Sequence, residues 1–489
     1  MVKSCLFIVL ILIWTVTADA QSGAPPTPAA SPVPLPSPVE TPKSSTDKFS
    51  PPPLKNLRYD EDFSYLRDEK KRVDWLDRLK FIPFNRAENW YLTLGGEIRQ
   101  RYEIYLNAGF GTGVKDDSGY WLERYMLHAD FHFGKRFRVF AQLKSGLVEN
   151  RNGGARPNDL DKLEFNQAFA DFTIYEKKGK SLNVRIGRQE VEFGSSRLVA
   201  AREGANVRQS FDGARLFLKL GRWQFSPSFF KSVVTKRGFF DDRTNHEQTF
   251  WGGYAARSLP KRWNGIAVVY FNELDSKRSR YDQGAGRERR KSVGARIAGK
   301  TGAFDFNYEV IGQFGDFAGA DIRAWAIITD SGYAFPKLKF KPRLAVRADA
   351  TSGDKNPLDA KLQTFNPLFA AAVAYSGQVS LISPSNSTAF VPSLELNLSK
   401  RLAVKFDDAT FWRTSRRDAL YGSLDAQRTG RLSRAKFVGN QPSAQIVWRI
   451  NRYLSSTTVY THFFTGKFLR ETPPAKDVDY LTSYLTFKF

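Results

Sequence analysis

The stretch RIGRQEVEFGSSRLVAAREGANVRQSFDGAR, Arg185 to Arg215, decides the fold of this chain. Apolar and polar residues alternate over residues 183–187 and again over residues 214–220, the period-two pattern of a strand with one apolar and one polar face. The connection between these strands is long and carries three basic side chains, Arg197, Arg202 and Arg208. The stretch therefore predicts two strands with apolar outer faces, joined by an arginine-rich loop that belongs to a pore wall and its constriction.

The regularity weakens at one point in this stretch. The alternation of apolar and polar residues is interrupted at Gly187, and such an interruption is typical of a β-bulge. A bulge at this position leaves open which face of the strand Arg188 occupies.

The same alternation runs from Tyr91 to the last residue, Phe489. Counting the alternating runs gives about 18 strands of roughly 9–14 residues, the length that a tilted strand needs to cross a bilayer. Very short connections, such as Gly221, alternate nearly throughout with long ones, the longest over residues 352–389. Outer-membrane barrels separate short periplasmic turns from long external loops in this way. We therefore predict an all-β fold, a transmembrane antiparallel up-and-down β-barrel of about 18 strands.

The composition agrees with a barrel and excludes membrane-spanning helices. The chain has 489 residues, and its 74 Lys and Arg against 50 Asp and Glu give a formal net charge of +24. The mean hydropathy is −0.42, and no segment approaches the roughly 20 apolar residues of a membrane-spanning helix. A chain without such helices can cross a membrane only as a closed barrel, because lipid cannot satisfy open backbone groups. An exported soluble β-protein stays an alternative at this stage, although no propeller-type repeat of about 40 residues is found.

The chain divides into four segments. Residues 1–20 have a charged start, an apolar run and a small-residue cleavage site, which indicate a cleaved secretory signal peptide. Residues 21–53 are rich in Pro, Ala, Ser and Thr and are predicted to be a disordered linker. Residues 54–90 are predicted to be a periplasmic segment, in which residues 63–80 form a short amphipathic helix. Residues 91–489 form the predicted barrel.

The charged side chains of such a barrel must point into the lumen, because a Lys or Arg that faces lipid at mid-membrane costs about 2–4 kcal/mol. Some inward arginines are expected to pair with inward carboxylates, and the remaining cations create a field that attracts anions. The planar guanidinium group suits carboxylates, which it binds bidentately. Part of the charge has a competing explanation, since basic runs such as RERRK (Arg287 to Lys291) suit lipid phosphate groups. The expected inward carboxylates are Glu97, Glu103, Asp130, Asp171, Glu309, Asp349, Glu395 and Asp407.

Three segments resemble the alginate-export porin family of Gram-negative outer membranes. They are LGGEIRQRYE (Leu94 to Glu103), GRQEVEFGSSRLVAAREGANVRQSFDGAR (Gly187 to Arg215) and TSGDKNPLDAKLQTFNPLF (Thr351 to Phe369). The resemblance implies a monomeric barrel of about 18 strands with an electropositive constriction. It also implies passage of alginate, a linear polymer with one carboxylate per sugar.

The resemblance assigns pore-lining or constriction roles to Glu97, Arg99, Arg101, Arg185, Arg188, Arg202, Arg208 and Arg215. The polar faces of the alternating strands add Lys219, Arg347 and Asp349. The loop around residues 353–357 is expected to fold over or into the lumen, with an ordinary external loop as the alternative.

The sequence predicts no catalytic residue, no metal site and no cofactor. The single cysteine, Cys5, lies in the signal peptide, so the mature chain has neither disulfides nor a thiolate metal site. His128 and His132 share a strand face with Asp130, and histidines that face a polar lumen explain this pattern more simply than a metal does. Ser195 lacks the flanking pattern of a nucleophile elbow. An outer-membrane hydrolase, with a serine and a histidine paired across strands, stays the alternative from another functional class.

We therefore expect a passive, anion-selective channel of the bacterial outer membrane for alginate, another acidic polysaccharide or an organic anion. The runner-up is a general porin for the uptake of small anionic nutrients. The expected partners are the transported anion, outer-membrane lipid and lipopolysaccharide, the barrel-assembly machinery and periplasmic export partners. The chain is expected to act as a monomer and not to bind nucleic acid, because no nucleic-acid-binding module is recognisable.

Overall fold

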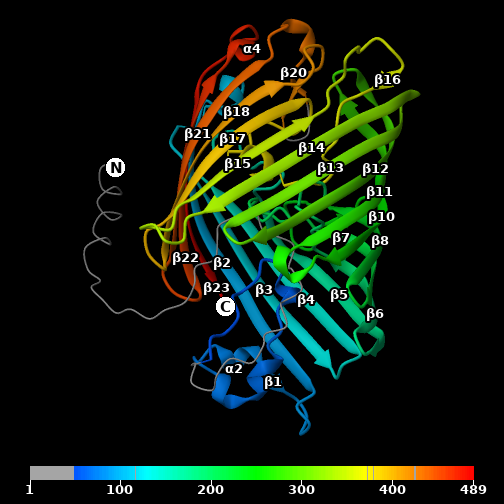
Figure 1. The fold of residues 1–489 in the computed structure, drawn as a ribbon, viewed down its shortest axis with the longest axis vertical. Helices are drawn as coiled ribbons and strands as arrows, with labels where there is room; N and C mark the ends of the chain where they lie inside the picture. Colours follow the sequence, from blue (N-terminus) through cyan, green and yellow to red (C-terminus); the bar gives the residue numbers. More distant parts are fainter. Residues whose placement is uncertain (1–48, 116, 372, 378, 423–425) are drawn as a thin grey trace.

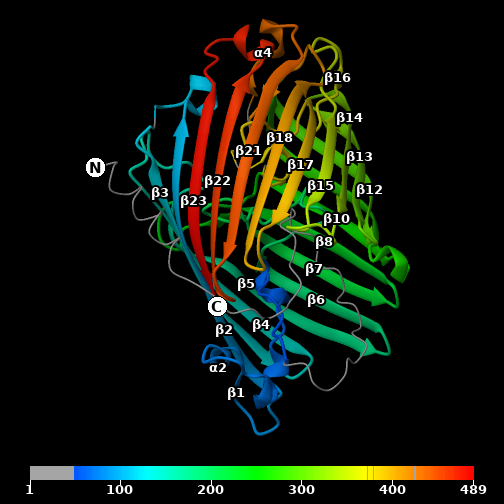
Figure 2. The same ribbon diagram turned by 60° about the vertical axis from the view of Figure 1, so that its left-hand side comes forward.

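The computed structural model describes residues 49–489 apart from residues 116, 372, 378 and 423–425. The predicted signal peptide and most of the Pro-rich linker lie outside the described residues. The described chain forms a closed antiparallel barrel of 18 strands (Figure 1). The first and last strands close the cylinder by pairing from Glu97↔Lys488 to Leu106↔Asp479, and Figure 2 shows the last strand between its two neighbours. The predicted up-and-down barrel is confirmed.

The barrel strands follow one another around the wall in chain order. They are β2 (Trp90–Leu106), β3 (Tyr120–Phe133), β4 (Phe137–Glu149), β5 (Asp161–Lys177), β6 (Lys180–Gln189), β7 (Phe211–Leu220), β8 (Trp223–Val234), β10 (Gln248–Ser258), β11 (Ile266–Tyr281), β12 (Gly284–Thr301), β13 (Phe304–Phe317), β14 (Ala320–Ala334), β15 (Arg343–Thr351), β17 (Ser387–Asn397), β18 (Leu402–Arg413), β21 (Phe437–Arg449), β22 (Leu454–Thr465) and β23 (Val478–Lys488). Short strands in the connections are β9 (Arg243–Thr244), β16 (Lys361–Leu362), β19 (Leu420–Tyr421) and β20 (Ala426–Arg428). Short helices in the connections are η4 (Ala108–Gly111), η5 (Lys261–Trp263), α3 (Val373–Ser376), η6 (Gly430–Leu432) and α4 (Lys467–Arg470). Within the described part of the chain, no helix is long and apolar enough to cross a membrane.

The two ends of the barrel differ in their connections. The end that holds the C-terminus carries short connections and is called the turn end below. The opposite end, called the loop end, carries long connections over residues 190–210, 352–386 and 414–436 and two tight turns at residues 282–283 and 318–319. This separation is the one expected for periplasmic turns and external loops.

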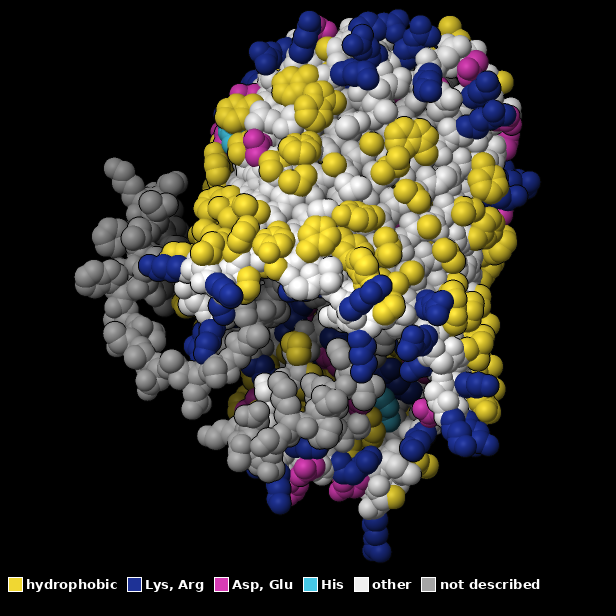
Figure 3. Space-filling view, viewed as in Figure 1, with side chains coloured by type: hydrophobic (Ala, Val, Ile, Leu, Met, Phe, Trp, Pro, Cys, Tyr) yellow, Lys and Arg dark blue, Asp and Glu magenta, His cyan; other side chains and the backbone are white. Residues whose placement is uncertain are grey.

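The alternation of the sequence becomes an alternation of faces. On β3, the side chains of Arg124 and His128 are 1% and 2% exposed and point into the lumen. The intervening Tyr125 and Leu127 are 36% and 54% exposed on the outer face. Figure 3 shows hydrophobic side chains over the middle of the wall and Lys and Arg side chains toward both ends. The outer skin is therefore apolar and the inner face is charged, as a transmembrane barrel requires.

Gly187 is not part of a bulge, which corrects the expectation from its sequence. The pairing of β6 with β5 and β7 continues through Gly187 without a shift in register. Its φ of +130° and the carbonyl oxygen of Ala168, 2.3 Å from where a Cβ would lie, both require glycine here. Because the pairing is regular, Arg188 shares the outward face with its cross-strand neighbours Ala168 and Asp212.

Residues 49–83, called the N-terminal segment below, lie at the turn end. Their elements are η1 (Arg58–Asp60), η2 (Ser64–Arg67), η3 (Glu69–Lys71), α2 (Asp77–Lys80) and β1 (Ile82–Pro83). The helix expected over residues 63–80 is wrong, because this stretch consists of separate short turns. Asp68 accepts a hydrogen bond from the backbone of Lys70 (3.1 Å), and Asp77 accepts one from Val73 (2.8 Å). Such local side-chain bonds favour turns over a continuous helix.

The N-terminal segment enters the lumen. Tyr59 is 4% exposed and packs against Phe140 and Phe169 on the inner wall. Arg58 donates hydrogen bonds to the carbonyl oxygens of Gly96 (2.9 Å) and the C-terminal Phe489 (2.7 Å). The segment is thereby fixed to the closure between the first and last strands.

One side of the lumen is filled by a hydrophobic core. Its aromatic members are Phe193, Phe211, Phe230, Phe250, Tyr254, Tyr270, Phe365, Phe369 and Tyr375. They come from the inner faces of β7, β8, β10 and β11 and from the two loops over residues 190–210 and 352–386. This side, along β7 to β14, is called the aromatic half below. On the other side, along β15 to β23 and β2, a second hydrophobic cluster lies at the loop end, and a charged space remains nearer the turn end.

Candidate functional site

The loop over residues 190–210 folds inward from the loop end and is fixed inside the barrel by its backbone. Val207 donates to the carbonyl of Asn158 (2.9 Å), and Gln209 donates to that of Ala201 (2.9 Å). The side-chain amide of Asn206 donates to the carbonyl of Asp159 (2.8 Å). The loop that the sequence places at the constriction therefore lies in the lumen as an ordered element.

The loop over residues 352–386 meets the first loop in the middle of the lumen. The backbone N–H of Phe369 donates a hydrogen bond to the carbonyl of Leu198 (2.8 Å), and the carbonyl of Phe369 accepts a hydrogen bond from the backbone N–H of Ala200 (3.2 Å). The hydroxyl of Tyr375 donates to the carbonyl of Arg197 (2.7 Å). At its start this loop instead covers the loop end, where the backbone N–H of Asp354 donates to Asp418 (2.8 Å). The loop thus folds both over and into the lumen.

Two of the cavities in the described part of the chain lie beside these loops. The inner chamber, of about 480 Å³, lies against β15, β17, β18 and β21 to β23. The outer vestibule, of about 380 Å³, lies toward the loop end beside residues 156–159. Arg101 and Arg202 line both cavities, so they mark the boundary between vestibule and chamber.

The lining of the inner chamber carries more positive than negative charge. Eight cationic residues face it, Arg99, Arg101, Arg197, Arg202, Arg343, Arg347, Lys405 and Lys488. Five carboxylates face it, Glu192, Glu203, Asp330, Glu395 and Asp407. The excess of cations in a narrow space with low-dielectric walls makes this chamber attractive to anions.

Arg202 differs from the other predicted arginines. It lies at the tip of the inward loop with a left-handed backbone (φ +58°) and is half-buried. Among the described residues, no hydrogen bond or ion pair is made by its guanidinium group. Burial lowers the pKa of Arg202, and no carboxylate opposes this effect. No carboxylate of the described residues therefore neutralises its charge at the boundary between the two cavities.

The arginines of β2 hold the inward loop in place. Arg99 donates to the carbonyl of Glu203 (3.0 Å), and Arg101 donates to that of Gly204 (2.7 Å). Arg208 forms ion pairs with Glu203 (2.6 Å) and Glu190 (2.7 Å). Buried charge pairs of this kind fix a geometry, since removal of one partner leaves the other uncompensated.

Glu97 lies at the centre of a cationic cluster. It forms ion pairs with Arg124, with Lys488 (3.5 Å) and with Arg99 (3.6 Å). Arg124 of the same cluster also forms an ion pair with Glu203 of the inward loop (2.7 Å). These carboxylates neutralise only part of the surrounding charge, so the cluster contributes to the positive field of the inner chamber.

Three further predicted residues lie below the inward loop. Arg185 forms a bidentate pair with Asp171 (2.7 and 2.8 Å) and stacks on Tyr59, 4.1 Å from the ring centroid. Arg215 donates to the hydroxyl of Ser226 (2.6 Å). Lys219 is exposed near the turn end of β7. None of these three residues lines the inner chamber or the outer vestibule.

Arg188 lies outside the lumen. Its guanidinium group forms an ion pair with Asp212 (2.8 Å), which also accepts a hydrogen bond from Thr244 (2.7 Å). These residues lie on the outer face near the loop end of β6 and β7. Arg188 is therefore separated from both cavities by the barrel wall.

Arg347 and Asp349 belong to the inner side of β15. Asp349 lies between Arg347 (3.1 Å) and Arg197 (3.2 Å), and Arg347 also donates to the carbonyl of Tyr375 (2.5 Å). Arg347 lines the inner chamber, whereas Asp349 is buried behind it. The pair joins the wall to the loop over residues 352–386.

Four cations of the chamber were not among the predicted site residues: Arg197, Arg343, Lys405 and Lys488. Arg197 belongs to the arginine-rich loop, and the other three lie on the polar faces of strands, where the alternation alone could have indicated them. Arg343 pairs with Asp305 (2.6 Å), and Lys405 pairs with Asp407 (3.2 Å). Charged positions on the last strands therefore matter to the chamber as much as those of the inward loop.

The N-terminal segment forms the floor beneath the inward loop. The hydroxyl of Tyr59 donates to the carbonyl of Glu190 (2.9 Å), and Arg208 donates to the carbonyl of Asn56 (3.2 Å). Lys488 donates to the side chain of Asn56 (3.2 Å). The segment thereby narrows the lumen at the turn end. Sequence reasoning missed this contact, because the segment has no strand alternation.

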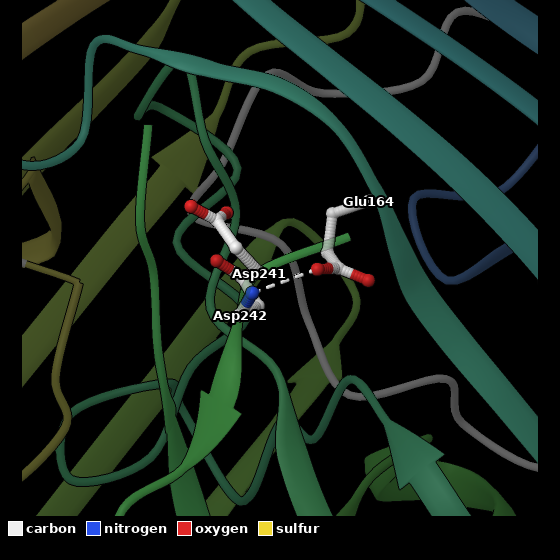
Figure 4. Close-up of side chains that lie close together, drawn as sticks. All are labelled: Glu164, Asp241 and Asp242. Atoms are coloured by element: carbon white, nitrogen blue, oxygen red, sulfur yellow. Dashed lines mark hydrogen bonds between the residues drawn. The ribbon is translucent and has the colours of Figure 1, made fainter. Parts of the chain in front are cut away.

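One group of carboxylates lies near enough together to consider as a cation site. Figure 4 shows Glu164, Asp241 and Asp242, which come from β5 and from the connection between β8 and β10. Glu164 accepts a hydrogen bond from the backbone N–H of Asp242 (2.8 Å), and Lys144 is 3.1 Å from the carboxylate of Asp242. Asp241 accepts one from Gly238 (3.2 Å). These contacts anchor the connection to the wall, with Lys144 as counter-charge.

Comparison with known proteins identifies the family. The family model for alginate export matches residues 90–481, which is nearly the whole barrel. The chain belongs to the alginate export family. No curated protein matches the sequence.

Solved structures share the fold at low sequence identity. Pseudomonas aeruginosa OpdK, determined with vanillate, has a TM-score of 0.55 at 9% identity, over 81% of this chain and 98% of its own. A BenF-like porin from Pseudomonas fluorescens Pf-5 has a TM-score of 0.55 at 10% identity, over 81% and 98%. Pseudomonas aeruginosa OccD3 (OpdP) has a TM-score of 0.55 at 10% identity, over 81% and 91%. This member of the alginate export family therefore has a porin fold.

Proposed function

We propose that this protein is a passive, anion-selective channel of the bacterial outer membrane that passes an acidic polysaccharide such as alginate. The observation that carries the proposal is Arg202, a cation without a partner among the described residues at the boundary between two cavities. Membership of the alginate export family supports a polymer of uronate sugars as the cargo. A cleaved signal peptide over residues 1–20 would direct the chain to this membrane.

The charge arrangement suits transport better than tight binding. The chamber cations lie at several levels of the wall, from Arg202 at the vestibule to Lys488 near the turn end. Most of them are partly neutralised by a carboxylate, as Arg343 is by Glu395 (3.1 Å). Several weak sites in series let an anion enter and still leave. A carboxylate on each sugar could then move from one guanidinium group to the next.

The uptake of small organic anions is the second candidate. The two cavities measure only about 480 and 380 Å³, the size of a small-molecule site. The similar fold of OpdK was determined with vanillate, a small aromatic carboxylate. A polymer would need the N-terminal segment to move, whereas a small anion would need less space.

Transport is a better account of the polar lumen than hydrolysis. The hydroxyl of Ser195 donates a hydrogen bond to Glu309, a carboxylate that also accepts one from Tyr270 (2.8 Å). Ser195 thereby anchors the inward loop to β11 and β13. A nucleophilic serine would instead be paired with a general base such as histidine.

Ion selectivity of the purified full-length protein in planar bilayers tests the proposal. The reversal potential in a potassium chloride gradient should have the sign of an anion-selective pore. Arg202→Glu should shift it toward cation selectivity, and Arg202→Lys should retain most of the anion preference. Arg188→Gln, outside the lumen, should leave it unchanged. Equal reversal potentials for the wild type and Arg202→Glu would contradict the role of Arg202.

The same bilayers distinguish the two cargoes. Oligomers of uronate sugars added to the loop-end side should block the chloride current of the wild type more strongly than a monomeric uronate. Stronger block by the monomer would favour the small-anion porin. Block that is equal in Arg202→Glu and the wild type would place the cargo elsewhere.

A further inference from the structure

The basic run RERRK does not lie in a loop but on the wall of the barrel. Arg287, Arg289 and Lys291 of β12 alternate with Glu288 and Arg290, which are both 0% exposed and point inward. The three other cations therefore face outward, near the loop end of the strand. This stripe has no role in the proposed transport path, because the wall separates it from the lumen.

A groove lies directly below this stripe on the lipid-facing side. It has a volume of about 880 Å³ and crosses β8 and β10 to β14, which Figure 1 shows side by side. The strand registers align one row of outward residues along it, Pro227, Gly253, Phe271, Val293, Gly312 and Trp325. The small residues Gly253 and Gly312 form the depression between larger apolar side chains. For Gly312, a Cβ would meet no atom within 4 Å, so the space beside it is open.

The next row toward the loop end, called the cationic row below, carries Lys291 and Arg323 together with Glu273, the cross-strand neighbour of Lys291. Lys291 pairs across strands with Phe314, and Phe314 pairs with Arg323. Adjacent strands are about 4.8 Å apart, so Lys291 and Arg323 begin roughly 10 Å apart on either side of Phe314. The two rows are only two residues apart along each strand, about 7 Å. A single ligand with an anionic head and an apolar body could therefore contact both.

The acidic side chains on this outer surface neutralise the cationic row only in part. Asp275 pairs with Arg287 (2.8 Å) and Arg289 (3.4 Å), above the row. Arg323 and Asp321 are 3.4 Å apart, but both side chains are more than 60% exposed, and exposed pairs are weak. Glu273 lies directly across from Lys291, and Asp316 lies directly across from Arg289, but Glu273 forms no ion pair with Lys291 in the described part of the chain. Among the described residues, Lys291 makes no hydrogen bond or ion pair.

We propose that this surface is a binding site for a phosphorylated glycolipid of the outer leaflet, namely lipopolysaccharide. Lys291 and Arg323 bind the phosphate groups of the lipid head, and Phe314 lies beneath the head between them. An acyl chain lies in the groove along Val293, Gly312 and Trp325. The inference needs the barrel to span the outer membrane, but it is independent of the anion selectivity of the lumen.

Binding of bisphosphorylated lipid A to the delipidated full-length protein in mild detergent tests the site, measured by native mass spectrometry. The double variant Lys291→Glu with Arg323→Glu should bind at least about tenfold more weakly, because each basic residue near a membrane contributes roughly a fivefold factor. The control Arg222→Glu with Arg257→Glu changes the same charge at the turn end and should bind like the wild type. Heat-modifiable migration on gels reports folding of every variant.

A second pair of variants tests the groove separately from the charge. Gly312→Leu fills the open space and should weaken lipid A binding, while Ala267→Leu, outward on β11 but outside the groove, should not. Dephosphorylated lipid A should bind the wild type as weakly as bisphosphorylated lipid A binds the charge variant. Equal binding of all variants, or equal binding of phosphorylated and dephosphorylated lipid A, would overturn the proposal.

Discussion

The aromatic half of the lumen and the turn-end part of the opposite half are built from the same alternating strands but are filled in opposite ways. In the aromatic half, Phe369 packs against Phe211 and Phe250, with ring centroids 5.1 and 5.5 Å apart. In the other half, the inner chamber is open and lined by more cations than carboxylates. The inward loop over residues 190–210 divides them, with Phe193 on the aromatic side and Arg202 at the chamber. An 18-stranded wall encloses more space than one narrow pathway needs, and the aromatic core removes the surplus.

The comparison also explains why so many predicted arginines are paired. Arg101, Arg185 and Arg208 hold the loop or the N-terminal segment in position, whereas Arg202 at the loop tip has no such partner among the described residues and is the one proposed to meet the solute. All these arginines carry the same charge, so the residue type alone does not show which of them hold the structure together and which line the proposed path. The surroundings of each guanidinium group make that distinction.

The largest expected effect comes from opening the aromatic half. Phe369→Ala removes a 6% exposed ring from the contact between the two inward loops. Such a truncation costs about 3–5 kcal/mol of packing, so the loop over residues 352–386 should detach and the single-channel conductance should rise. Phe464→Ala, on the outer face with 48% exposure, is the control and should conduct like the wild type. An unchanged conductance in Phe369→Ala would mean that the aromatic half does not restrict the pore.

A smaller effect is expected from the N-terminal segment, which lies beneath the inward loop. Tyr59→Ala removes the ring between Phe140 and Phe169 and the hydrogen bond to Glu190, a loss of roughly 3 kcal/mol. The N-terminal segment is still held by Arg58 and Asn56, so we expect brief openings of higher conductance and not a permanently wider pore. Phe84→Ala, 54% exposed in the same region, serves as the matched control. Identical single-channel traces for Tyr59→Ala and Phe84→Ala would exclude the segment as a restriction.

The smallest effect is a pH dependence of the same segment. Burial, together with the nearby Arg58, lowers the pKa of Lys80 from 10.5 to about 7. Between pH 7 and 10.5, Lys80 is protonated when the N-terminal segment has left the lumen but is mostly neutral when the segment is docked. Docking therefore releases a proton, and the free energy of docking should become more favourable as the pH rises. The expected gain from pH 7 to pH 8 is about 1 kcal/mol. It should appear as slower amide exchange of residues 57–60, corrected for the intrinsic rate.

Lys80→Met provides the control for this pH dependence. Methionine keeps the contact with the rings of Phe63 and Phe489 but has no proton to release. The variant should therefore show no change in corrected exchange between pH 7 and pH 8. The same change in the variant and the wild type would assign the pH dependence to another group.

Much of the wall could be predicted from the sequence, because alternation reports directly which residues face lipid. The strand–loop–strand unit around Arg202 is confirmed, with β6 and β7 joined by residues 190–210. The outward position of Arg188 could not be derived, because the conformation of Gly187 depends on the approach of Ala168 across the strands. The entry of Tyr59 into the lumen could not be derived either, since that contact joins residues far apart in sequence and follows no periodic pattern.

The cationic row of the lipid-facing wall illustrates the same limit. The run RERRK indicated a lipid contact, but the sequence did not show that β12 extends to Gly284 and so includes this run. Because the run belongs to a strand, its residues alternate between the two faces of the wall. Arg290 is thereby buried in the lumen, where it donates to Gln313 (2.9 Å), while Lys291 faces lipid. The register with β13 and β14 then decides which apolar residues lie beside it.

Cysteine accessibility in the open channel tests the division of the lumen most directly. After the predicted signal peptide the chain has no cysteine, so single substitutions can be compared without background. Ser443 lines the inner chamber, and Ser292 is a buried inner residue of the aromatic half. A negatively charged thiol reagent should reduce the current through Ser443→Cys and leave the current through Ser292→Cys unchanged. A reduced current through Ser292→Cys with no change in Ser443→Cys would contradict the account.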